Sequence, residues 1–258
     1  MELLEKIVQI VKETSEIILE AEHIRDSIDC KEGSNNFVTE YDKRVQAKLF
    51  EDLAKILPEA EFMGEEEENH NYQEKGYQFI IDPIDGTTNF IRGYQASAIS
   101  VALLKDNEPY MGVIYNPYRD EIFYAKKKEG AYCNGKPIHV SKEPLERALI
   151  LTGTTPYRKD LCQEVMDMIA RVFAKTTDIR RSGSAALDMA AIASGRADIF
   201  FELILSPWDY AGASVLIEEA GGKIFGLDGK PVQFKEPQAI VVCGEGIDTE
   251  ELLRLCNG

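Results

Sequence analysis

Two aspartates at the end of an apolar run are the first residues whose type and spacing suggest chemistry. The stretch FIIDPIDGTTNF places Asp82 and Asp85 three positions apart, directly after residues typical of a buried strand. Pro83 stiffens the bend between them, and Gly86 begins a segment whose backbone N–H groups and hydroxyls can bind an anion. Clustered carboxylates beside such a segment are typical of a metal and phosphate site. A hairpin turn at Asp-Gly is the simpler alternative.

Two further acidic segments lie far from these aspartates in the chain. GEEEENH follows two apolar residues, which indicates a strand that ends at Glu65, with Glu66 as the alternative ligand. In PWDYAGASVLIEEAGG, Asp209 follows the only tryptophan and falls in the first turn of an expected helix. A solvated acidic run explains the first segment alone, and an acid that favours the helix dipole explains the second. Each segment supports a metal site only in combination with the other acids.

Composition argues against several classes of protein. The chain has 258 residues, and its 29 Lys and Arg against 45 Asp and Glu give a formal charge of -16. Such a charge repels nucleic acid and anionic membranes, so we expect neither as a partner. No window is apolar enough for a membrane span, and the N-terminus does not resemble a signal peptide, which predicts a cytoplasmic location. Five cysteines without a CxxC pair and three histidines without ligand spacing do not suggest zinc or a catalytic triad.

The spacing of apolar residues predicts two differently organised halves. An amphipathic helix is expected over 2–25, a second helix from 40 to Pro58, and an antiparallel sheet over 79–138. From about residue 148, strands and helices alternate. The expected strands there are 148–153, 197–203, 222–226 and 239–244, and the expected helices are 159–173, 183–195, 206–222 and 251–256. We therefore divide the chain into an N-terminal subdomain, 1–142, and a C-terminal subdomain, 143–258, that completes the site.

The motifs GEE, DPIDGTTNF, GSAAL and WDYAGA, with EEAGG after the last, resemble those of a known family in order and spacing. They resemble the inositol monophosphatase family of Mg²⁺-dependent, lithium-sensitive sugar phosphatases, and the similarity runs from Asp42 in VTEYD to Gly222. It implies an α/β fold, a layered αβαβα sandwich with an antiparallel sheet in the N-terminal half and a mixed sheet in the C-terminal half. It also implies hydrolysis of myo-inositol monophosphate and a homodimer.

The resemblance assigns roles to matching residues. The implied ligands of two or three Mg²⁺ ions are Glu65, Asp82, Asp85, Asp209 and the backbone carbonyl of Ile84. The implied catalytic residues are Asp42, Thr87 and Glu65, of which Asp42 and Thr87 activate the attacking water. The implied substrate contacts are Asp85, Gly86, Thr87, Gly183, Ser184, Ala185, Glu202 and Asp209. A helix of small residues packed on a neighbour is the alternative reading of GSAALDMAAIASG.

Electrostatics gives a reason for these acids. Four carboxylates carry about -4 and a phosphate monoester about -2, and each pair of unit charges 4 Å apart repels by about 4 kcal/mol at an effective dielectric of 20. Mg²⁺, which prefers oxygen ligands, would reverse the local charge, lower the pKa of a bound water and stabilise the leaving alkoxide. We expect in-line attack by that water, without a phosphoenzyme.

Several alternatives remain open. A dual-specificity enzyme would also cleave fructose 1,6-bisphosphate, with a second phosphate held by guanidinium groups. The candidate contacts for that phosphate are Tyr157, Arg158, Arg180 and Arg181. A phosphoadenosine phosphate phosphatase is a weaker alternative. A haloacid-dehalogenase-type phosphatase has its acids at i and i+2 rather than i and i+3, and a non-enzymatic metal- or sugar-binding protein is the last rival.

Two features of the chain bear on the metal count and register. The segment CKEGSNNF matches a mobile metal-binding loop of the family, in which Lys31 would lie near a third metal. The spacing from Glu65 to Asp82 is 17 positions, shorter than in many members of the family.

Overall fold

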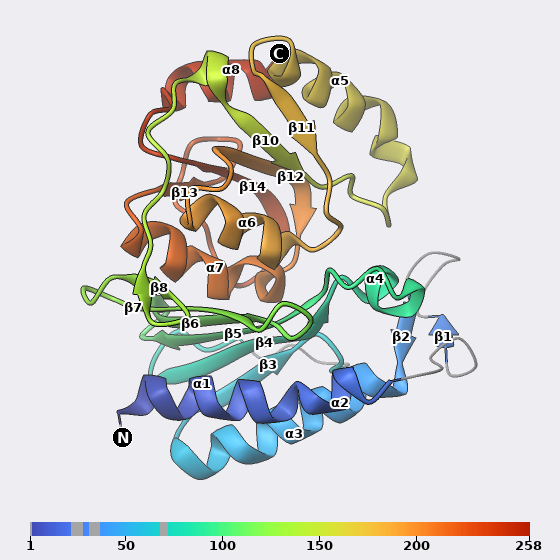
Figure 1. Ribbon diagram of the computed structural model, residues 1–258, viewed down its shortest axis with the longest axis vertical. Helices are drawn as coiled ribbons and strands as arrows, with labels where there is room; N and C mark the ends of the chain where they lie inside the picture. The colour runs from blue at the N-terminus through green and yellow to red at the C-terminus, as the bar shows by residue number, and fades with distance from the viewer. Residues whose placement is uncertain (1, 22–27, 31–36, 68–71) are drawn as a thin grey trace.

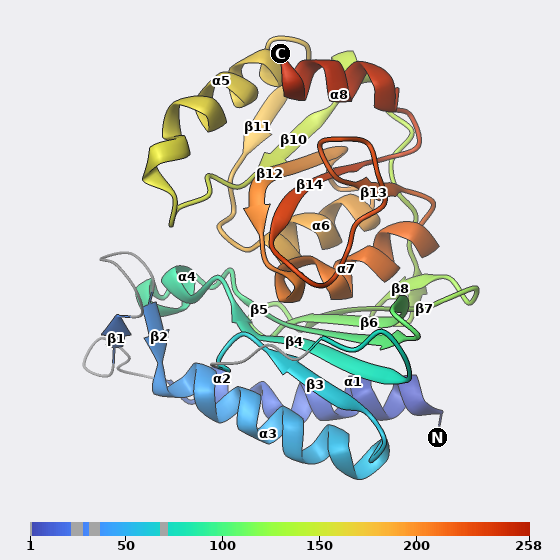
Figure 2. The ribbon, with the colours of Figure 1, turned by 180° about the vertical axis from the view of Figure 1, so that it is seen from behind.

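Five layers of helix and sheet make up the protein. The computed structural model describes residues 2–21, 28–30, 37–67 and 72–258. Figure 1 shows α5 and α8 outermost, then a five-stranded sheet, then α6 and α7, then a seven-stranded sheet, and finally α1 to α3. The same order is visible from behind in Figure 2. The predicted αβαβα sandwich is confirmed.

The N-terminal layer contains amphipathic helices. They are α1 (Leu3–Thr14), α2 (Glu16–Leu19) and α3 (Glu40–Ile56). The helix expected over 2–25 is divided at Ser15, and its last residues, 22–25, lie outside the described part of the chain. The Ser15 hydroxyl donates to the Lys12 carbonyl at 2.7 Å, a local bond that competes with helix hydrogen bonds. Val11 and Leu49 belong to the core between these helices and the sheet. The helix expected from 40 to Pro58 is confirmed.

The seven-stranded sheet follows the order of the chain. Its strands are β3 (Glu61–Gly64), β4 (Tyr77–Asp85), β5 (Ala98–Lys105), β6 (Glu108–Asn116), β7 (Glu121–Lys126), β8 (Ala131–Cys133) and β9 (Lys136–Pro137). The predicted antiparallel pairing holds from β4 to β9, but β3 runs parallel to β4, with Gly64 opposite Ile81. Parallel strands have their carboxyl ends at the same edge of a sheet, so this pair brings the acids after β3 toward those at the end of β4.

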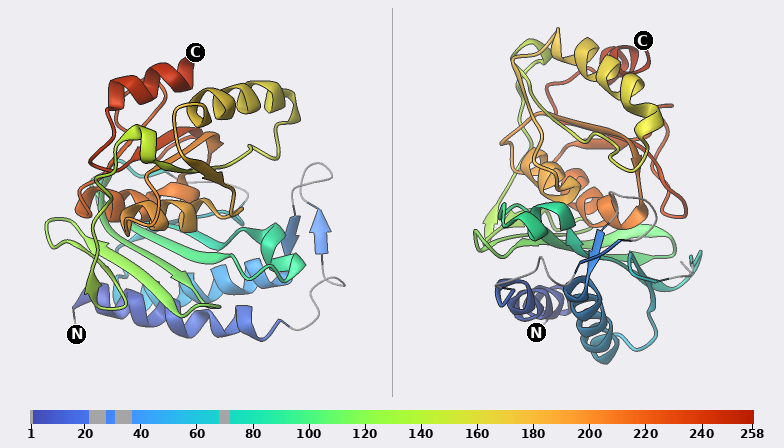
Figure 3. Two further views of the ribbon diagram at one scale, coloured as in Figure 1. Left: turned by 45° about the horizontal axis from the view of Figure 1, so that its top comes forward. Right: turned by 90° about the vertical axis from the view of Figure 1, so that its right-hand side faces the viewer.

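The five-stranded sheet is mixed, as expected. Its strands are β10 (Leu149–Thr152), β11 (Asp178–Arg180), β12 (Ile199–Leu205), β13 (Lys223–Phe225) and β14 (Gln238–Cys243), in the order β11-β10-β12-β14-β13. β10 is parallel to β11 and β12, whereas β14 is antiparallel to β12 and β13. The sequence did not predict β11, because three residues with one apolar side chain carry no strand pattern. α5 (Cys162–Phe173) and α8 (Thr249–Asn257) cover the outer face (Figure 3).

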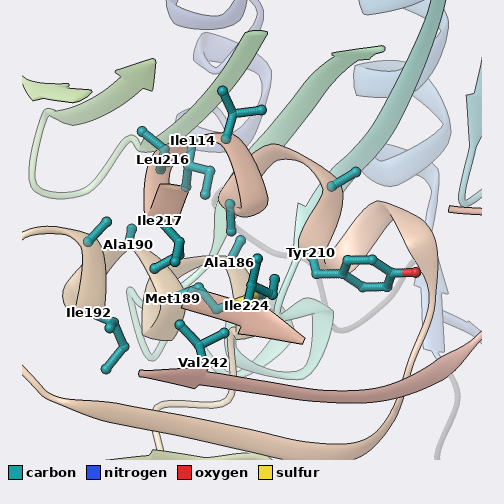
Figure 4. Packing of buried hydrophobic residues seen from close by; sticks show 14 of the residues in the cluster. Ile114, Ala186, Met189, Ala190, Ile192, Tyr210, Leu216, Ile217, Ile224 and Val242 are labelled. Atoms are coloured by element: carbon teal, nitrogen blue, oxygen red, sulfur yellow. The ribbon is translucent and has the colours of Figure 1, made fainter. Parts of the chain in front are cut away.

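The central layer joins the two sheets. It holds α6 (Ala185–Ala193) and α7 (Pro207–Glu219), and α7 is apolar on all sides because protein surrounds it. Gly112 of β6 packs against the backbone of Gly212 in α7, so closely that a Cβ on Gly112 would overlap the Gly212 carbonyl. Figure 4 shows Ile114, Leu216 and Val242, from a sheet, the helix and the other sheet, in one cluster. The division at residue 142 remains a proposal, and the two parts share a core.

Three short elements complete the chain as described. β1 (Ile28–Cys30) and β2 (Phe37–Thr39) form an antiparallel pair, and α4 (Thr87–Arg92) follows β4. Single 3₁₀ turns occur at Leu145–Arg147 and Lys159–Leu161. None of the described helices combines the length and the apolar character that crossing a membrane requires.

Candidate active site

Three buried or half-buried carboxylates from distant parts of the chain meet in one cavity. Asp82 and Asp85 come from the end of β4 and Asp209 from the first turn of α7, and one carboxylate oxygen of each lies within 4.8 Å of the others. The cavity has a volume of about 690 Å³ and is also lined by Glu65. Glu66 is not among the described residues that line it. The geometry therefore favours Glu65 over Glu66 as the fourth acid.

A bulge in β4 explains how Asp82 and Asp85 reach the same cavity. Residues three apart in a regular strand point to opposite faces. Here Asp82 pairs with Ser100 and Asp85 with Ala98, so three steps along β4 match two along β5 and both aspartates return to one side. Pro83, which has no N–H to donate, lies within the bulge. The hairpin-turn alternative is wrong, because Gly86 (φ 91°) leads into α4 instead.

The start of α6 holds Asp85 in place. Its carboxylate accepts hydrogen bonds from the Ser184 hydroxyl, the Ala186 amide at 2.7 Å and the Ala185 amide at 3.3 Å. Burial raises the pKa of Asp85 to about 6, although these hydrogen bonds oppose the rise. Gly183, Ser184 and Ala185 line the cavity, as their predicted role requires. Their contact with substrate stays a prediction, since Ser184 and Ala185 already donate to Asp85.

Asp209 is fixed by the geometry of a helix start. It occupies the third position of α7, and its Oδ2 accepts from the Ser206 amide at 2.7 Å in a capping box. Burial raises the pKa of Asp209 well above its ordinary value, and repulsion from Asp85 and Glu65 raises it further. The predicted position in the first turn is confirmed. A capping role alone would not place this acid beside two others.

The cluster is unfavourable without positive charge. Burial raises the pKa of Asp82 most, followed by repulsion from Glu65, Asp85, Asp209 and Asp42. A buried group of acids that repel one another, with oxygen as the only donor atom, fits a hard divalent cation such as Mg²⁺.

Asp42 and Thr87 lie together at the edge of this group. Asp42, on α3, is fully buried, and the Thr87 hydroxyl at the start of α4 lies 3.4 Å from its Oδ1. The same hydroxyl is 3.3 Å from the carbonyl oxygen of Ile84, so its single hydrogen can serve one of two acceptors. The structure thus brings the predicted water-activating pair next to a predicted metal ligand.

Two more buried acids line the same cavity. Glu202 of β12 accepts from the Thr155 amide at 2.8 Å, and burial raises its pKa to about 7. Burial also raises the pKa of Asp188 on α6 to about 7. The sequence analysis missed Asp188, although it is the only charged residue of GSAALDMAAIASG and that isolation was a usable signal. It gave no role to Gly153, which it placed at the end of the expected strand 148–153, or to Thr155.

Exposed cations surround the mouth of the cavity. The four that line it are Arg92, Arg158, Lys159 and Arg181. Arg158 is paired with Asp160 at 2.6 Å, and Tyr157 beside it is 60% exposed. Of the predicted contacts for a second phosphate, Arg180 is bonded to Asp178 and is not among the described lining residues. Lys31 and most of its loop lie outside the described residues, so the third metal site is not placed.

Comparison with known proteins identifies the family. The model of the inositol monophosphatase family matches residues 1–257. The Nus factor SuhB of Salmonella typhimurium is 37% identical over 200 residues, which are 77% of this chain and 75% of that protein. Inositol monophosphatase 3 of Solanum lycopersicum is 36% identical over 235 residues, 88% of this chain and 87% of that one. The chain belongs to the inositol monophosphatase family.

A solved structure supports the same placement. The IMPase of Thermotoga maritima superposes with a TM-score of 0.90 at 29% identity, over 100% of this chain and 97% of that chain. The whole sandwich, rather than one half, is therefore common to the two proteins.

Proposed function

We propose that the protein is a Mg²⁺-dependent phosphomonoesterase that hydrolyses myo-inositol monophosphate to inositol and phosphate. The observation that carries this proposal is the meeting of Asp82, Asp85 and Asp209 in one cavity beside Glu65. Family membership supports phosphatase chemistry, and the name of the tomato relative supports the substrate.

The metal-binding part of the proposal rests on the oxygen donors. Two or three Mg²⁺ ions would be held by Glu65, Asp82, Asp85, Asp209 and the carbonyl of Ile84. When bound, the ions supply positive charge that attracts the phosphate, acidifies water and stabilises the leaving group. The chain's own part is to hold the acids rigidly through the β4 bulge, the α6 amides and the α7 capping box.

The reacting water would be positioned by Thr87 and Asp42. We propose that the water donates a proton to Thr87 Oγ1 while the Thr87 hydroxyl donates to Asp42 Oδ1, which lies 3.4 Å away. Glu65, on the same cavity wall, completes the catalytic set. The backbone N–H groups of Gly86 and Thr87 would donate to phosphate oxygens. Attack is in line, and no phosphoenzyme forms.

The sugar would lie between Glu202 and the cluster of Asp82, Asp85 and Asp209. Glu202 would accept hydrogen bonds from its hydroxyls, with Gly183, Ser184 and Ala185 beside it. Uncharged hydroxyls suit this part of the cavity, because Glu202 is buried and the negative charge of Asp85 acts on it.

A second candidate function is dual specificity for fructose 1,6-bisphosphate. The cations at the cavity mouth favour it, because Arg181 and Lys159 have no ion pair among the described residues and could meet a second phosphate. A phosphoadenosine phosphate phosphatase remains the weaker alternative. We also propose lithium inhibition, a homodimer and a cytoplasmic location, all from the family resemblance.

A substrate panel with and without Mg²⁺ tests the proposal. We expect phosphate release from inositol 1-phosphate only with Mg²⁺, and weaker or comparable release from fructose 1,6-bisphosphate. Release from phosphoadenosine phosphate alone would overturn the substrate assignment. A trapped phosphoenzyme would favour the haloacid-dehalogenase rival, and no release from any monoester would leave a binding protein.

A further inference from the structure

Glu202 occupies space that exists only because its neighbour across the sheet has no side chain. Gly153 follows β10, and a Cβ built on it would overlap the carboxyl group of Glu202. The backbone of Gly153 is hydrogen-bonded to β12, because its N–H donates to the Phe201 carbonyl at 3.3 Å. The Thr152 hydroxyl lies 3.0 Å from the same carbonyl and 2.9 Å from the Gly153 carbonyl, and its single hydrogen can serve either acceptor. The end of β10 is thus bonded to β12 one residue before Glu202.

The next residues of the loop orient this carboxyl group. The Thr155 amide donates to Glu202 Oε1 at 2.8 Å, and no other described residue donates to that carboxyl group in a hydrogen bond. Glu202 Oε2 packs against Gly153 and receives no hydrogen bond from the described residues, and both Glu202 and Thr155 line the cavity.

Thr155 adopts a costly conformation to make this bond. Its φ of 45° is unusual for a β-branched side chain, and its hydroxyl is buried without a hydrogen-bond partner among the described residues. Strain and an unpaired polar atom at one residue beside a cavity indicate a functional constraint. The constraint visible here is the direction of the Thr155 N–H toward Glu202.

We propose that Gly153 and Thr155 determine specificity for polyol phosphates by positioning the Glu202 carboxyl group, an inference that rests on the proposed function. Gly153 provides the space and the Thr155 amide sets the direction. Neither residue needs to touch the phosphate or the metal ions. Their influence should therefore depend on whether the substrate has hydroxyl groups that reach Glu202.

Gly153→Ala tests the proposal, because the φ of Gly153 lies outside the left-handed region and the three atoms nearest the new methyl group all belong to the Glu202 carboxyl group. The measurement is kcat/KM for inositol 1-phosphate divided by kcat/KM for p-nitrophenyl phosphate, which lacks polyol hydroxyls. We expect this ratio to fall by about 10- to 100-fold, as for loss of a hydrogen bond to a charged group, and mainly through KM for the polyol ester. An unchanged ratio would overturn the proposal.

A second substitution separates positioning from general damage. Glu202→Asp shortens the acid by one methylene and should lower the ratio in the wild-type background. In the Gly153→Ala background it should raise the ratio, because the carboxyl group withdraws from the new Cβ. If Gly153→Ala alone does not fold, the double variant should regain a cooperative thermal transition. The proposal would be contradicted if the double variant showed neither a higher kcat/KM ratio nor a higher thermal stability than Gly153→Ala.

A glycine elsewhere in the chain serves as the control. Gly226→Ala places a Cβ 3.0 Å from the exposed side chain of Asp228. Gly226 is not among the described residues that line the cavity. The ratio of the two kcat/KM values for Gly226→Ala should equal that of the wild type. If the wild type hydrolyses p-nitrophenyl phosphate but no polyol phosphate, the substrate assignment and this inference both fail. If it hydrolyses polyol phosphates and Gly153→Ala keeps the ratio, only this inference fails.

Discussion

Asp82 is buried among other acids. This position makes its ionised form unfavourable and also allows it to bind a cation. Desolvation and neighbouring carboxylates raise its pKa, so the ionised form is unfavourable until positive charge arrives. The Ile84 amide, which donates to Asp82 Oδ1 at 3.0 Å, stabilises it only in part. Binding a divalent cation converts the repulsion into attraction.

Asp82→Asn should separate activity from folding. We expect Mg²⁺-dependent turnover to fall at least 1,000-fold, on the order of 4 kcal/mol of lost transition-state stabilisation. The metal-free thermal midpoint should stay the same or rise by a few degrees, because one repelling charge is gone. The control is Asp167→Asn, an exposed change on α5. Near-normal turnover by Asp82→Asn would refute its role as a ligand.

Glu202 should make metal-free stability depend on pH. Burial raises its pKa from 4.5 to about 7, so the native state binds a proton that the unfolded chain releases above pH 4.5. Its contribution to the free energy of unfolding therefore falls as pH rises from about 4.5 to 7. At about 1.4 kcal/mol per pKa unit, the loss reaches about 3 kcal/mol at pH 8.

Glu202→Gln removes this penalty. The variant should melt several degrees above the wild type at pH 8 and at the same temperature at pH 4, where Glu202 is protonated. Thermal melts in chelator measure the difference, with the exposed Glu164→Gln as control. A stabilisation that is equal at both pH values would show that the Glu202 charge is not the cause.

One side chain of α4 connects this helix to the segment that precedes α6. The Asn89 amide nitrogen donates to the carbonyls of Ala96 at 2.7 Å and Ser182 at 2.9 Å. Gly183 (φ 93°) packs directly against Asn89, and a Cβ there would lie 3.0 Å from it. This bridge connects the loop after Asp85 to the start of the helix whose amides hold Asp85.

Asn89→Ala should weaken both the fold and the metal site. The loss of two part-buried hydrogen bonds predicts about 1 to 3 kcal/mol less stability in urea titrations. The Mg²⁺ concentration for half-maximal activity should rise about tenfold as Asp85 loses its fixed position. Gln163→Ala, on exposed α5, controls for loss of an amide side chain. A lower stability with unchanged Mg²⁺ dependence would limit Asn89 to a structural role.

The layers and the helices near the acids were predictable from local patterns. Apolar periodicity predicted α3, and motif order predicted which acids meet. The β4 bulge was not predictable in detail, because Pro83 signals an interruption but not the register on the partner strand. Gly153 and Thr155 were not predictable either, since their importance arises from the packing of β10 against β12. Parallel pairing of β3 with β4 likewise depends on contacts distant in sequence.

Both parts of the chain contribute residues to one cavity, and the two sheets enclose a shared helical layer. Asp82 and Asp85 belong to the N-terminal part, and Glu202 and Asp209 to the C-terminal part. Ligands that bind between them should therefore stabilise both parts together.

Mg²⁺ should raise the thermal midpoint of the protein in a single transition. A concentration 100 times the dissociation constant adds about 2.7 kcal/mol, or roughly 5 to 10 °C for a chain of this length. The rise should be larger at pH 8 than at pH 5, because protons compete for the raised-pKa carboxylates at the lower pH. Differential scanning calorimetry measures both. Two transitions, only one of them sensitive to Mg²⁺, would indicate that the parts unfold separately.

Direct titration of divalent ions tests the central claim, that these distant acids converge to hold them. Mn²⁺, followed by electron paramagnetic resonance, reports stoichiometry without any assumption about substrate. We predict at least two ions bound per wild-type chain, and at most one, at least tenfold more weakly, in Asp82→Asn/Asp209→Asn. The same stoichiometry and affinity in the wild type and the double variant would contradict the account.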